Sequence, residues 1–346
     1  MPTKLESRRT QQKRVVVTGG AGFIGCELVR QLAMAGHTVL VVDNLVNGRL
    51  ANLQGISRSV QLTVGDIRDR DLMNSLLQGA DLIFHLACLG VRHSIHSPRE
   101  NHDVNASGTL GLLTIARSAG VGRFVYVSSS EVYGTARTVP MTEEHSVYPK
   151  TVYGAAKFAG EAYTRAFWEV YRYPTVVVRP FNAYGPRCHH EGDSGEVIPK
   201  FVLRCLAGKP MVIFGDGSQT RDFTFVSDTA RGIMEAGFAD AAIGDTINLG
   251  SGREVRINDL AVTVAEILDR HGAEVVHDAP RPGDVLRLCA DTRKAHRLLG
   301  FSPRVTLREG IQKLARWYRD FDRSPEELLQ KETVRNWEPR GGASHA

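Results

Sequence analysis

The chain has 346 residues, of which 42% are hydrophobic and 23% charged, and its formal net charge is +5. These values are ordinary for a globular protein and exclude an intrinsically disordered chain. Basic residues gather in the first fourteen positions and elsewhere mix with acidic ones, so we expect no nucleic-acid partner.

The chain opens with a polar segment, residues 1–13, which we expect to be a disordered lead-in. No apolar run follows its basic residues as in a signal peptide, and no later stretch is apolar enough to cross a membrane. The five cysteines are scattered and lack the spacing of a disulfide framework or a zinc site. We therefore expect a cytoplasmic protein that binds neither a membrane nor a metal ion. We also expect it to form a homodimer.

Residues 14–180 alternate between short apolar, β-branched runs and stretches of helix length. The expected strands are 14–18, 38–42, 61–64, 82–85, 123–127 and 175–178, and the expected helices include 23–35, 108–119 and 153–171. This alternation predicts an α/β fold with a Rossmann-type, doubly wound parallel sheet and helices on both faces.

The amino-acid composition of the chain changes after Pro180, and residues 182–196 are rich in glycine, proline and histidine. Further strands are expected at 211–214 and 246–249, and a helix at 257–271. We interpret residues 181–320 mainly as a smaller C-terminal substrate-binding lobe, interleaved with the first domain and covering the carboxyl edge of the sheet. Residues 321–346 are expected to be a C-terminal tail.

A glycine-rich turn follows the first expected strand. Gly19, Gly22 and Gly25 satisfy a GxxGxxG spacing that lets backbone N–H groups approach a pyrophosphate at the start of a helix. Asp43 ends the second strand, where a carboxylate accepts from the adenosine ribose and repels a 2′-phosphate, which favours NAD over NADP. Asp66, after the third strand, is a candidate acceptor for the adenine amino group. The alternative is a glycine turn with two strand-end caps.

A second candidate site combines a helix with the end of a strand. Tyr153 and Lys157 stand four residues apart, so both side chains project from one face of a helix. An adjacent ammonium and a bound nicotinamide cation would lower the pKa of the tyrosine. The strand at 123–127 leads into Ser128, Ser129, Ser130 and Glu131 at the same sheet edge. A serine-rich turn that caps a strand is the alternative for these residues.

The motifs together resemble those of the extended short-chain dehydrogenase/reductase family, specifically its NAD-dependent sugar-nucleotide epimerases and dehydratases. The resemblance runs from about Arg14 to about Tyr318. It rests on the glycine loop and on the motifs Asp43-Asn44-Leu45, Gly65-Asp66-Ile67, His85-Leu86-Ala87, Ser128-Ser129-Ser130-Glu131-Val132-Tyr133-Gly134, Tyr153-Gly154-Ala155-Ala156-Lys157, Arg179-Pro180-Phe181-Asn182 and Gly215-Asp216-Gly217-Ser218-Gln219-Thr220-Arg221.

The resemblance implies roles for these residues. Tyr153 would take the proton of the sugar C4 hydroxyl, Lys157 would tune the tyrosine and hold the nicotinamide ribose, and Ser129 would hydrogen-bond the C4 oxygen. The NAD-binding positions that it implies are Gly19, Gly22, Phe23, Ile24, Gly25, Asp43, Asn44, Asp66, Ile67, Leu86, Ala87, Tyr153 and Lys157.

The same resemblance implies a nucleotide-diphosphate sugar as substrate. Asn182, Arg221 and Arg281 would contact the diphosphate, although each arginine could instead form a surface ion pair. Ser130 and Leu288 would line the sugar pocket, with Leu288 limiting the bulk accepted at C2.

Glu131 bears on which reaction follows oxidation at C4. Family 4-epimerases carry a small neutral residue at this place, whereas a glutamate could remove the C5 proton and promote loss of the C6 hydroxyl. We therefore favour a 4,6-dehydratase-type reaction on a nucleotide-diphosphate hexose over a UDP-sugar 4-epimerase. Ser130 departs from the Asp-Glu pair of dTDP-glucose dehydratases. Leu288, where decarboxylases carry an arginine, argues against a UDP-glucuronate decarboxylase.

The cluster of His189, His190, Glu191 and Asp193 also invites a metal site. Adjacent histidines project in different directions, so we expect a loop that covers the substrate and excludes water instead. Two rival classes are an NADPH reductase, which Asp43 argues against, and a non-catalytic NAD-binding regulator. Retention of both Tyr153 and Lys157 argues against the regulator.

Overall fold

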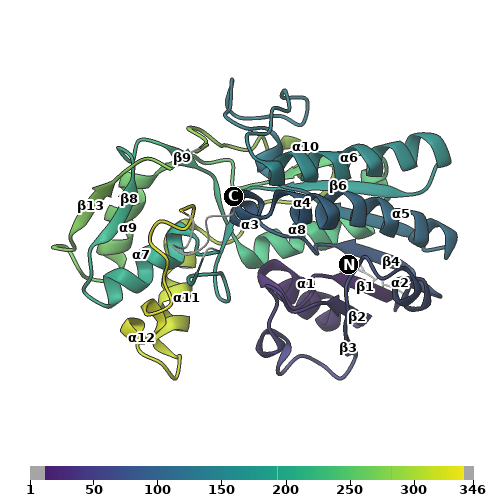
Figure 1. The fold of residues 1–346 in the computed structure, drawn as a ribbon, viewed down its shortest axis with the longest axis horizontal. Helices are drawn as coiled ribbons and strands as arrows, with labels where there is room; N and C mark the ends of the chain where they lie inside the picture. The colour runs from purple at the N-terminus through teal and green to yellow at the C-terminus, as the bar shows by residue number, and fades with distance from the viewer. Residues whose placement is uncertain (1–11, 193, 282, 339–346) are drawn as a thin grey trace, which may run out of the picture.

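The computed structural model of the protein describes residues 12–192, 194–281 and 283–338. Across these residues, seven parallel strands form one sheet with helices on both faces (Figure 1). In spatial order the strands are β11 (Thr246–Leu249), β6 (Thr175–Pro180), β5 (Arg123–Val127), β4 (Leu82–His85), β1 (Arg14–Thr18), β2 (Thr38–Asp43) and β3 (Val60–Val64). The predicted Rossmann-type fold is confirmed. The expected lead-in lies outside the described residues except for Gln12 and Lys13.

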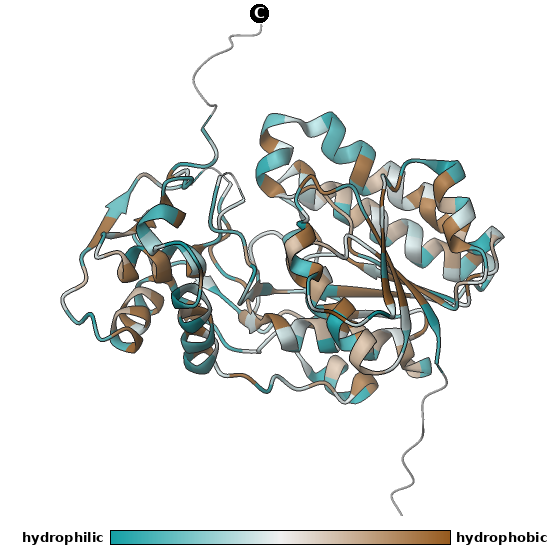
Figure 2. Cartoon of the chain, turned by 90° about the horizontal axis from the view of Figure 1, so that it is seen from below, coloured by the Kyte–Doolittle hydropathy of each residue, from teal (hydrophilic) through white to brown (hydrophobic). Residues whose placement is uncertain are grey.

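Side chains alternate between two apolar layers along each buried strand. Val15 and Val17 join the layer beneath α1 (Phe23–Met34) and α8 (Val226–Phe238), whereas Val16 joins the layer beneath α2 (Arg70–Leu77), α5 (Thr109–Ser118) and α6 (Val152–Tyr171). Figure 2 shows the hydrophobic strands enclosed between these helices. Because both faces are covered, the strands are almost continuously apolar.

One strand lies in a different place from the one we expected. Residues 246–249 form the edge strand β11 of the main sheet, paired with β6, and do not belong to the smaller lobe. Ile247 and Leu249 are fully buried in the layer beneath α8. Thr246–Leu249 is therefore the seventh strand, and the first domain extends beyond residue 180.

Some helix bounds also differ from the expected ones. The helix expected over 108–119 begins earlier with a π-helical stretch, η2 (Asp103–Gly108), that runs directly into α5. Helix α9 (Ile257–Ile267) ends before residue 271, and Asp269 just beyond it has a positive φ of 55°, which is incompatible with further helix. The short elements are α3 (Val91–His96), α4 (Pro98–His102), α10 (Arg293–Leu299), η1 (Leu50–Leu53), η3 (Ser130–Val132) and η4 (Asp240–Ala242).

The smaller lobe has an apolar core of its own. It contains α7 (Val197–Leu206), α9, α11 (Leu307–Arg319) and the parallel pair β8 (Met211–Phe214) and β13 (Val275–Asp278). Two further pairs, β7 (Asn182–Tyr184) with β10 (Phe223–Phe225) and β9 (Thr220–Arg221) with β12 (Val255–Arg256), lie in the connections between this lobe and the main sheet.

The segment expected as a tail is folded where the structure describes it. Residues 325–329 form α12 (Pro325–Leu329), which begins with a capping box between Ser324 and Glu327. Leu328 and Leu329 are buried in the core of the smaller lobe, so the expectation of a tail from residue 321 is wrong as far as residue 338. Residues 339–346 lie outside the described part of the chain.

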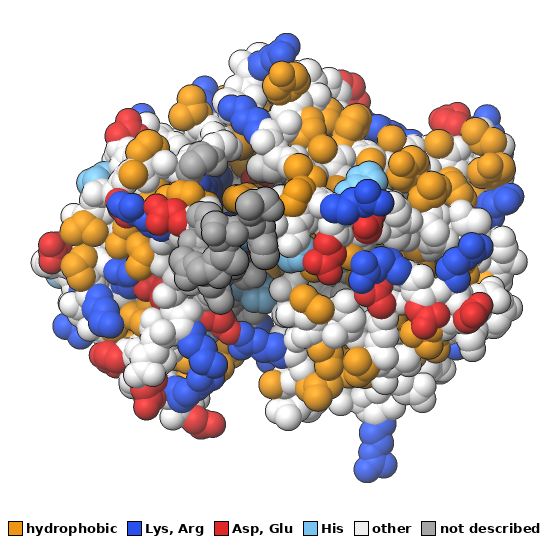
Figure 3. All heavy atoms as spheres, viewed as in Figure 1, with side chains coloured by type: hydrophobic (Ala, Val, Ile, Leu, Met, Phe, Trp, Pro, Cys, Tyr) orange, Lys and Arg blue, Asp and Glu red, His pale blue; other side chains and the backbone are white. Residues whose placement is uncertain are grey.

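On the face shown in Figure 3, lysine and arginine side chains are interspersed with aspartate and glutamate over both lobes. Among the described residues, no helix is long and apolar enough to cross a membrane.

Candidate active site

A cavity of about 500 Å³ lies between the two lobes, at the carboxyl ends of the parallel strands. Its walls come from the glycine loop, from the ends of β2 to β6, from the start of α6 and from α7 and β8 of the smaller lobe. The expected site residues that line it are Gly19, Gly22, Phe23, Ile24, Gly25, Asp43, Asn44, Asp66, Ile67, Leu86, Ala87, Ser129, Ser130, Glu131, Tyr153, Lys157, Asn182, Arg221 and Arg281.

The glycine loop is shaped so that larger residues would not fit. Gly19 has φ +72°, and a Cβ there would lie 2.6 Å from the backbone nitrogen of Ala87; a Cβ on Gly25 would lie 2.1 Å from the carbonyl oxygen of Gly19. Helix α1 is preceded by Gly22 at its N-cap, so it has no side-chain cap, and its first turn contains no acidic residue. Its first N–H groups are therefore available to an anionic ligand.

The three polar residues expected around the adenosine differ in how they are held. The Asp43 carboxylate accepts from the backbone nitrogens of Ala21 and Leu45, both at 2.9 Å, and is 7% exposed. A carboxylate accepts up to about four hydrogen bonds, so this one retains capacity for two hydroxyls. Asp66 is bonded to Arg68, which holds its pKa below the usual value, and Asn44 donates to Asp66 at 3.4 Å.

Tyr153 and Lys157 lie in the first two turns of α6, whose start is capped by Thr151. Burial raises the pKa of the Tyr153 phenol well above its usual value, and a hydrogen bond with Ser129 opposes this shift. We expected Lys157 to lower the pKa of Tyr153, but the chain by itself does not show this lowering. The Lys157 ammonium instead donates to the carbonyl of Val127 at 2.6 Å. Burial lowers the pKa of Lys157, which is 2% exposed.

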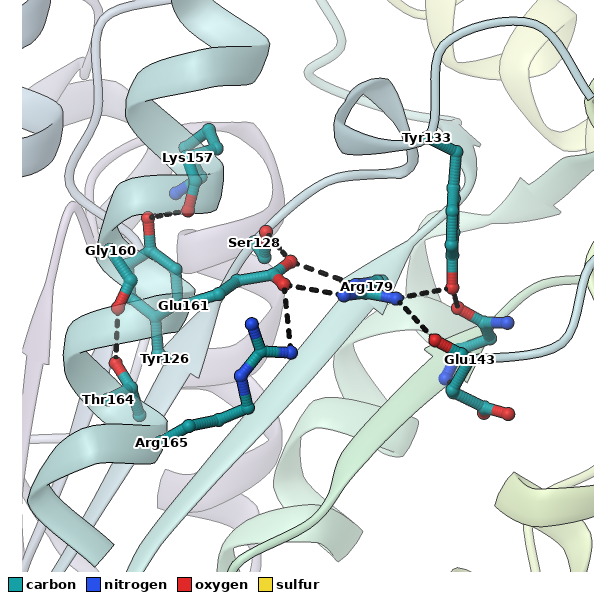
Figure 4. A network of polar contacts seen from close by, with 11 residues as sticks. Tyr126, Ser128, Tyr133, Glu143, Lys157, Gly160, Glu161, Thr164, Arg165 and Arg179 are labelled. Carbon is teal, nitrogen blue, oxygen red and sulfur yellow. Dashed lines mark hydrogen bonds and ion pairs between the residues drawn. The ribbon is translucent and has the colours of Figure 1, made fainter. Parts of the chain in front are cut away.

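A buried polar network holds this helix against the sheet (Figure 4). Arg179 at the end of β6 forms a two-pronged ion pair with Glu161 of α6, at 2.9 and 2.6 Å, and Ser128 donates to Glu161 at 2.5 Å. Arg179 also donates to the Tyr133 hydroxyl, which donates to Asn248 of β11. The network therefore fixes α6 relative to the strand end that carries Ser129.

Glu131 faces a group of three arginines. Burial raises the pKa of Glu131, whereas the charges of Arg221, Arg281 and Arg92 lower it. Arg221 and Arg281 both donate to Asp284, at 2.6 and 2.7 Å, so each forms an ion pair, as the alternative for them supposed, and both arginines also line the cavity. Arg221 is 8% exposed. An anionic ligand would meet guanidinium groups already oriented by this shared carboxylate.

Arg92 was missed in the sequence although it lines the cavity. It is the second residue of α3, seven residues after the end of β4, and its Nε has no hydrogen-bond partner among the described residues. Its place just beyond the end of a central strand could have revealed it, because ligands bind at that edge. Cys88 and Lys200 also line the cavity and were missed.

Leu288 does not line the cavity, which corrects our expectation. It is fully buried in a separate apolar cluster with Val132, Tyr133, Met141 and Phe181. Packing in this cluster stabilises Leu288, which supports the loop after β5 without reaching the cavity. Asn182 does line the cavity, and its Oδ1 has no partner among the described residues.

The histidine loop is tied to both lobes. Glu191 forms an ion pair with Arg49 beyond β2, and the His190 ring packs edge-on against Tyr318 of α11. His189, Ser194 and Glu196 line the cavity. Within the described ranges, which omit Asp193, no group of three or more metal-ligating side chains is placed to hold an ion.

The family model described as GDP-mannose 4,6-dehydratase matches residues 16–314. The chain belongs to the extended short-chain dehydrogenase/reductase family. This confirms the resemblance drawn from its motifs, and the family's solved structures share the fold described above.

Relatives within this family carry out different reactions. A UDP-glucose 4-epimerase of Mycolicibacterium smegmatis is 38% identical, over 89% of this chain and 99% of that protein. An epimerase from Methanothermobacter thermautotrophicus is 37% identical, with a TM-score of 0.86 over 93% of this chain and 95% of that one. A dTDP-glucose 4,6-dehydratase from Streptomyces venezuelae, solved with NAD bound, is 34% identical, with a TM-score of 0.83 over 89% and 97%. Similarity alone therefore leaves the reaction open.

Proposed function

We propose that this protein is an NAD-dependent sugar-nucleotide dehydratase that forms a 4-keto-6-deoxy sugar from a nucleotide-diphosphate hexose. The observation that carries the proposal is the Glu131 carboxyl in the cavity wall beside Tyr153, with its pKa raised by burial. A raised pKa makes the carboxylate a stronger base, which suits the removal of a proton from carbon.

The glycine cradle fits a dinucleotide. The close approaches at Gly19 and Gly25, the uncapped start of α1 and the spare acceptor capacity of Asp43 match a pyrophosphate and an adenosine ribose without a 2′-phosphate. NAD, when bound, would accept the hydride from C4 of the sugar and deliver it to C6 after water has left. Lys157 would hold the nicotinamide ribose.

Three side chains would take part in the first proton transfer, which removes the proton of the C4 hydroxyl. Tyr153 removes the proton of the C4 hydroxyl as the C4–H bond breaks, and Ser129 hydrogen-bonds the same oxygen. Because burial is the largest of the effects that raise the pKa of Tyr153, the phenolate has to be stabilised by cationic charge brought close to it, including that of Lys157.

Glu131 would act on the resulting ketone. The C4 carbonyl acidifies C5–H, so the Glu131 carboxylate removes that proton, the C6–O bond breaks, and the hydroxyl leaves as water with the proton that Glu131 has taken. The resulting 4-keto-5,6-ene becomes the 4-keto-6-deoxy sugar when C6 receives the hydride and C5 receives a proton from solvent. Ser130, which is 4% exposed and lines the cavity, would contact the sugar there. Arg221, Arg281 and Asn182 would bind the diphosphate, and the loop around His189 would exclude water.

The test is to incubate the purified protein with UDP-, dTDP-, GDP- and CDP-hexoses and to follow the products by NMR. We expect a 4-keto-6-deoxy sugar from one of them, and Glu131→Gln should lose dehydration while still reducing bound NAD. Formation of a C4 epimer by the wild type would instead support the second candidate, a UDP-sugar 4-epimerase. The 38% identical relative named for that reaction favours this alternative.

We also propose that the active form is a cytoplasmic homodimer. The outer faces of α5 and α6 expose apolar side chains, including Leu110, Val152 and Val170, which a second copy could cover. Light scattering should give twice the chain mass of 38.0 kDa, and a monomer would overturn this part.

A further inference from the structure

The segment that follows α12, residues 331–337, lies beyond the part of the chain that matches the family model, which ends at residue 314. In Figure 1 it is the yellow chain that turns back from α12 toward the middle of the molecule. Four of its side chains line the cavity between the lobes: Glu332, Val334, Asn336 and Trp337. We call residues 331–337 the C-terminal wall.

The C-terminal wall is anchored along its whole length. Glu332 forms an ion pair with Arg204 of α7 at 2.9 Å, and Lys200 of α7 donates to the carbonyl of Thr333 at 2.7 Å. Arg335 pairs with Asp278 at the end of β13 through two bonds of 2.6 and 2.9 Å. These contacts hold the segment in one position against the smaller lobe.

Its last member completes an aromatic corner. The rings of Trp337 and Phe214 meet edge to face, with centroids 4.6 Å apart, and both side chains line the cavity. Phe214 ends β8, and the apolar side chains of Phe201, Val212 and Ile213 line the cavity from α7 and β8, together with the charged Lys200 and Arg204 that hold the C-terminal wall. An aromatic and aliphatic corner of this kind suits a flat heterocyclic ring.

Two short stretches of chain connect the arginines of the site to this corner. The carbonyl of Phe214 accepts from Gln219, two residues before Arg221. Phe214 also pairs in the sheet register with Asp278, three residues before Arg281. A diphosphate held by Arg221 and Arg281, with its sugar directed to Tyr153, would place its nucleoside toward Phe214 and Trp337.

We propose that the C-terminal wall forms one side of the nucleoside subsite and that Trp337 packs against the base of the sugar nucleotide. This inference rests on the proposed function, since it assumes a nucleotide-diphosphate sugar. It assigns a binding role to a segment outside the family match.

The test measures binding of UDP, dTDP, GDP, CDP and inorganic pyrophosphate by calorimetry and by tryptophan fluorescence. Trp337→Ala should weaken binding of the preferred nucleoside diphosphate roughly 5- to 150-fold, the range expected for a stacked base, and should leave the affinity for pyrophosphate unchanged. Trp337→Phe should restore most of the affinity but lose the fluorescence response. Arg335→Ala, which frees the wall from Asp278, should weaken nucleoside binding in the same selective way.

Trp317→Phe is the matched control, because that tryptophan packs against Phe321 of the smaller lobe and does not line the cavity. It should keep both the affinity and the fluorescence response. Unchanged nucleoside affinity in Trp337→Ala and Arg335→Ala would overturn the role proposed for the C-terminal wall, and so would an equal weakening of pyrophosphate binding. Either result would leave the proposed function standing. Failure of every nucleoside diphosphate to bind the wild type would overturn both.

Discussion

The two ends of the cavity are built differently. At the end that fits the dinucleotide, the turn after β1 and the end of β2 supply Gly19, Gly25 and Asp43 from one short stretch, and the ends of later strands add residues such as Asp66 and Ala87. The opposite end joins pieces far apart in the sequence: β8, the stretch after β13 and residues 331–337. The first end is therefore a local property of the sequence, whereas the second exists only after the smaller lobe has folded.

The largest effect is expected from a substitution of Tyr153, where the two ends of the cavity meet. Tyr153→Phe should lower kcat about 10²- to 10⁴-fold, because it removes the proton-transferring oxygen, while binding at both ends stays nearly intact. Steady-state kinetics with calorimetric binding of substrate would check this. Tyr148→Phe, at an exposed tyrosine before the same helix, is the control. Near-normal kcat in Tyr153→Phe would mean that another group is the base.

The network behind α6 should matter for stability. Glu161→Gln leaves Arg179 buried without its counter-charge, which destabilises a protein by about 3–5 kcal/mol. Glu169→Gln on the same helix is the control, because its pair with Arg172 is more than 60% exposed on both sides. Urea unfolding would measure both variants. Equal stability of the two would show that the Arg179–Glu161 pair does not fix the helix.

A smaller change should affect one end alone. Asp43→Asn weakens the acceptor at the ribose and removes the charge that repels a 2′-phosphate, so NAD affinity should fall roughly tenfold and the preference over NADP should shrink. Calorimetry with both dinucleotides measures this, and affinity for nucleoside diphosphates should not change. Asp240→Asn, on the far exposed surface, serves as control. An unaltered preference for NAD would contradict the role given to Asp43.

The same contrast explains which features could be predicted from the sequence. The strands 14–18, 82–85, 123–127 and 211–214 have the predicted bounds, because each is a short β-branched or aromatic run between turn residues. The glycine loop, Ser129, Glu131, Tyr153 and Lys157 all reach the cavity as expected, since they stand directly after strands or at the start of a helix.

The errors have a common cause in tertiary packing. A run such as 246–249 looks alike in a small lobe and at the edge of a large sheet, and only the pairing with β6 distinguishes them. Leu288 and the segment after residue 320 were misjudged because no local signal tells whether an apolar side chain faces a cavity or a core.

The central claim is that Glu131 removes a proton from C5, and the most direct test is turnover of the preferred sugar nucleotide in D₂O. The account predicts a 4-keto-6-deoxy product with deuterium at C5, seen by NMR, and no such product from Glu131→Gln. A C4 epimer that keeps all its carbon-bound hydrogens would contradict the claim.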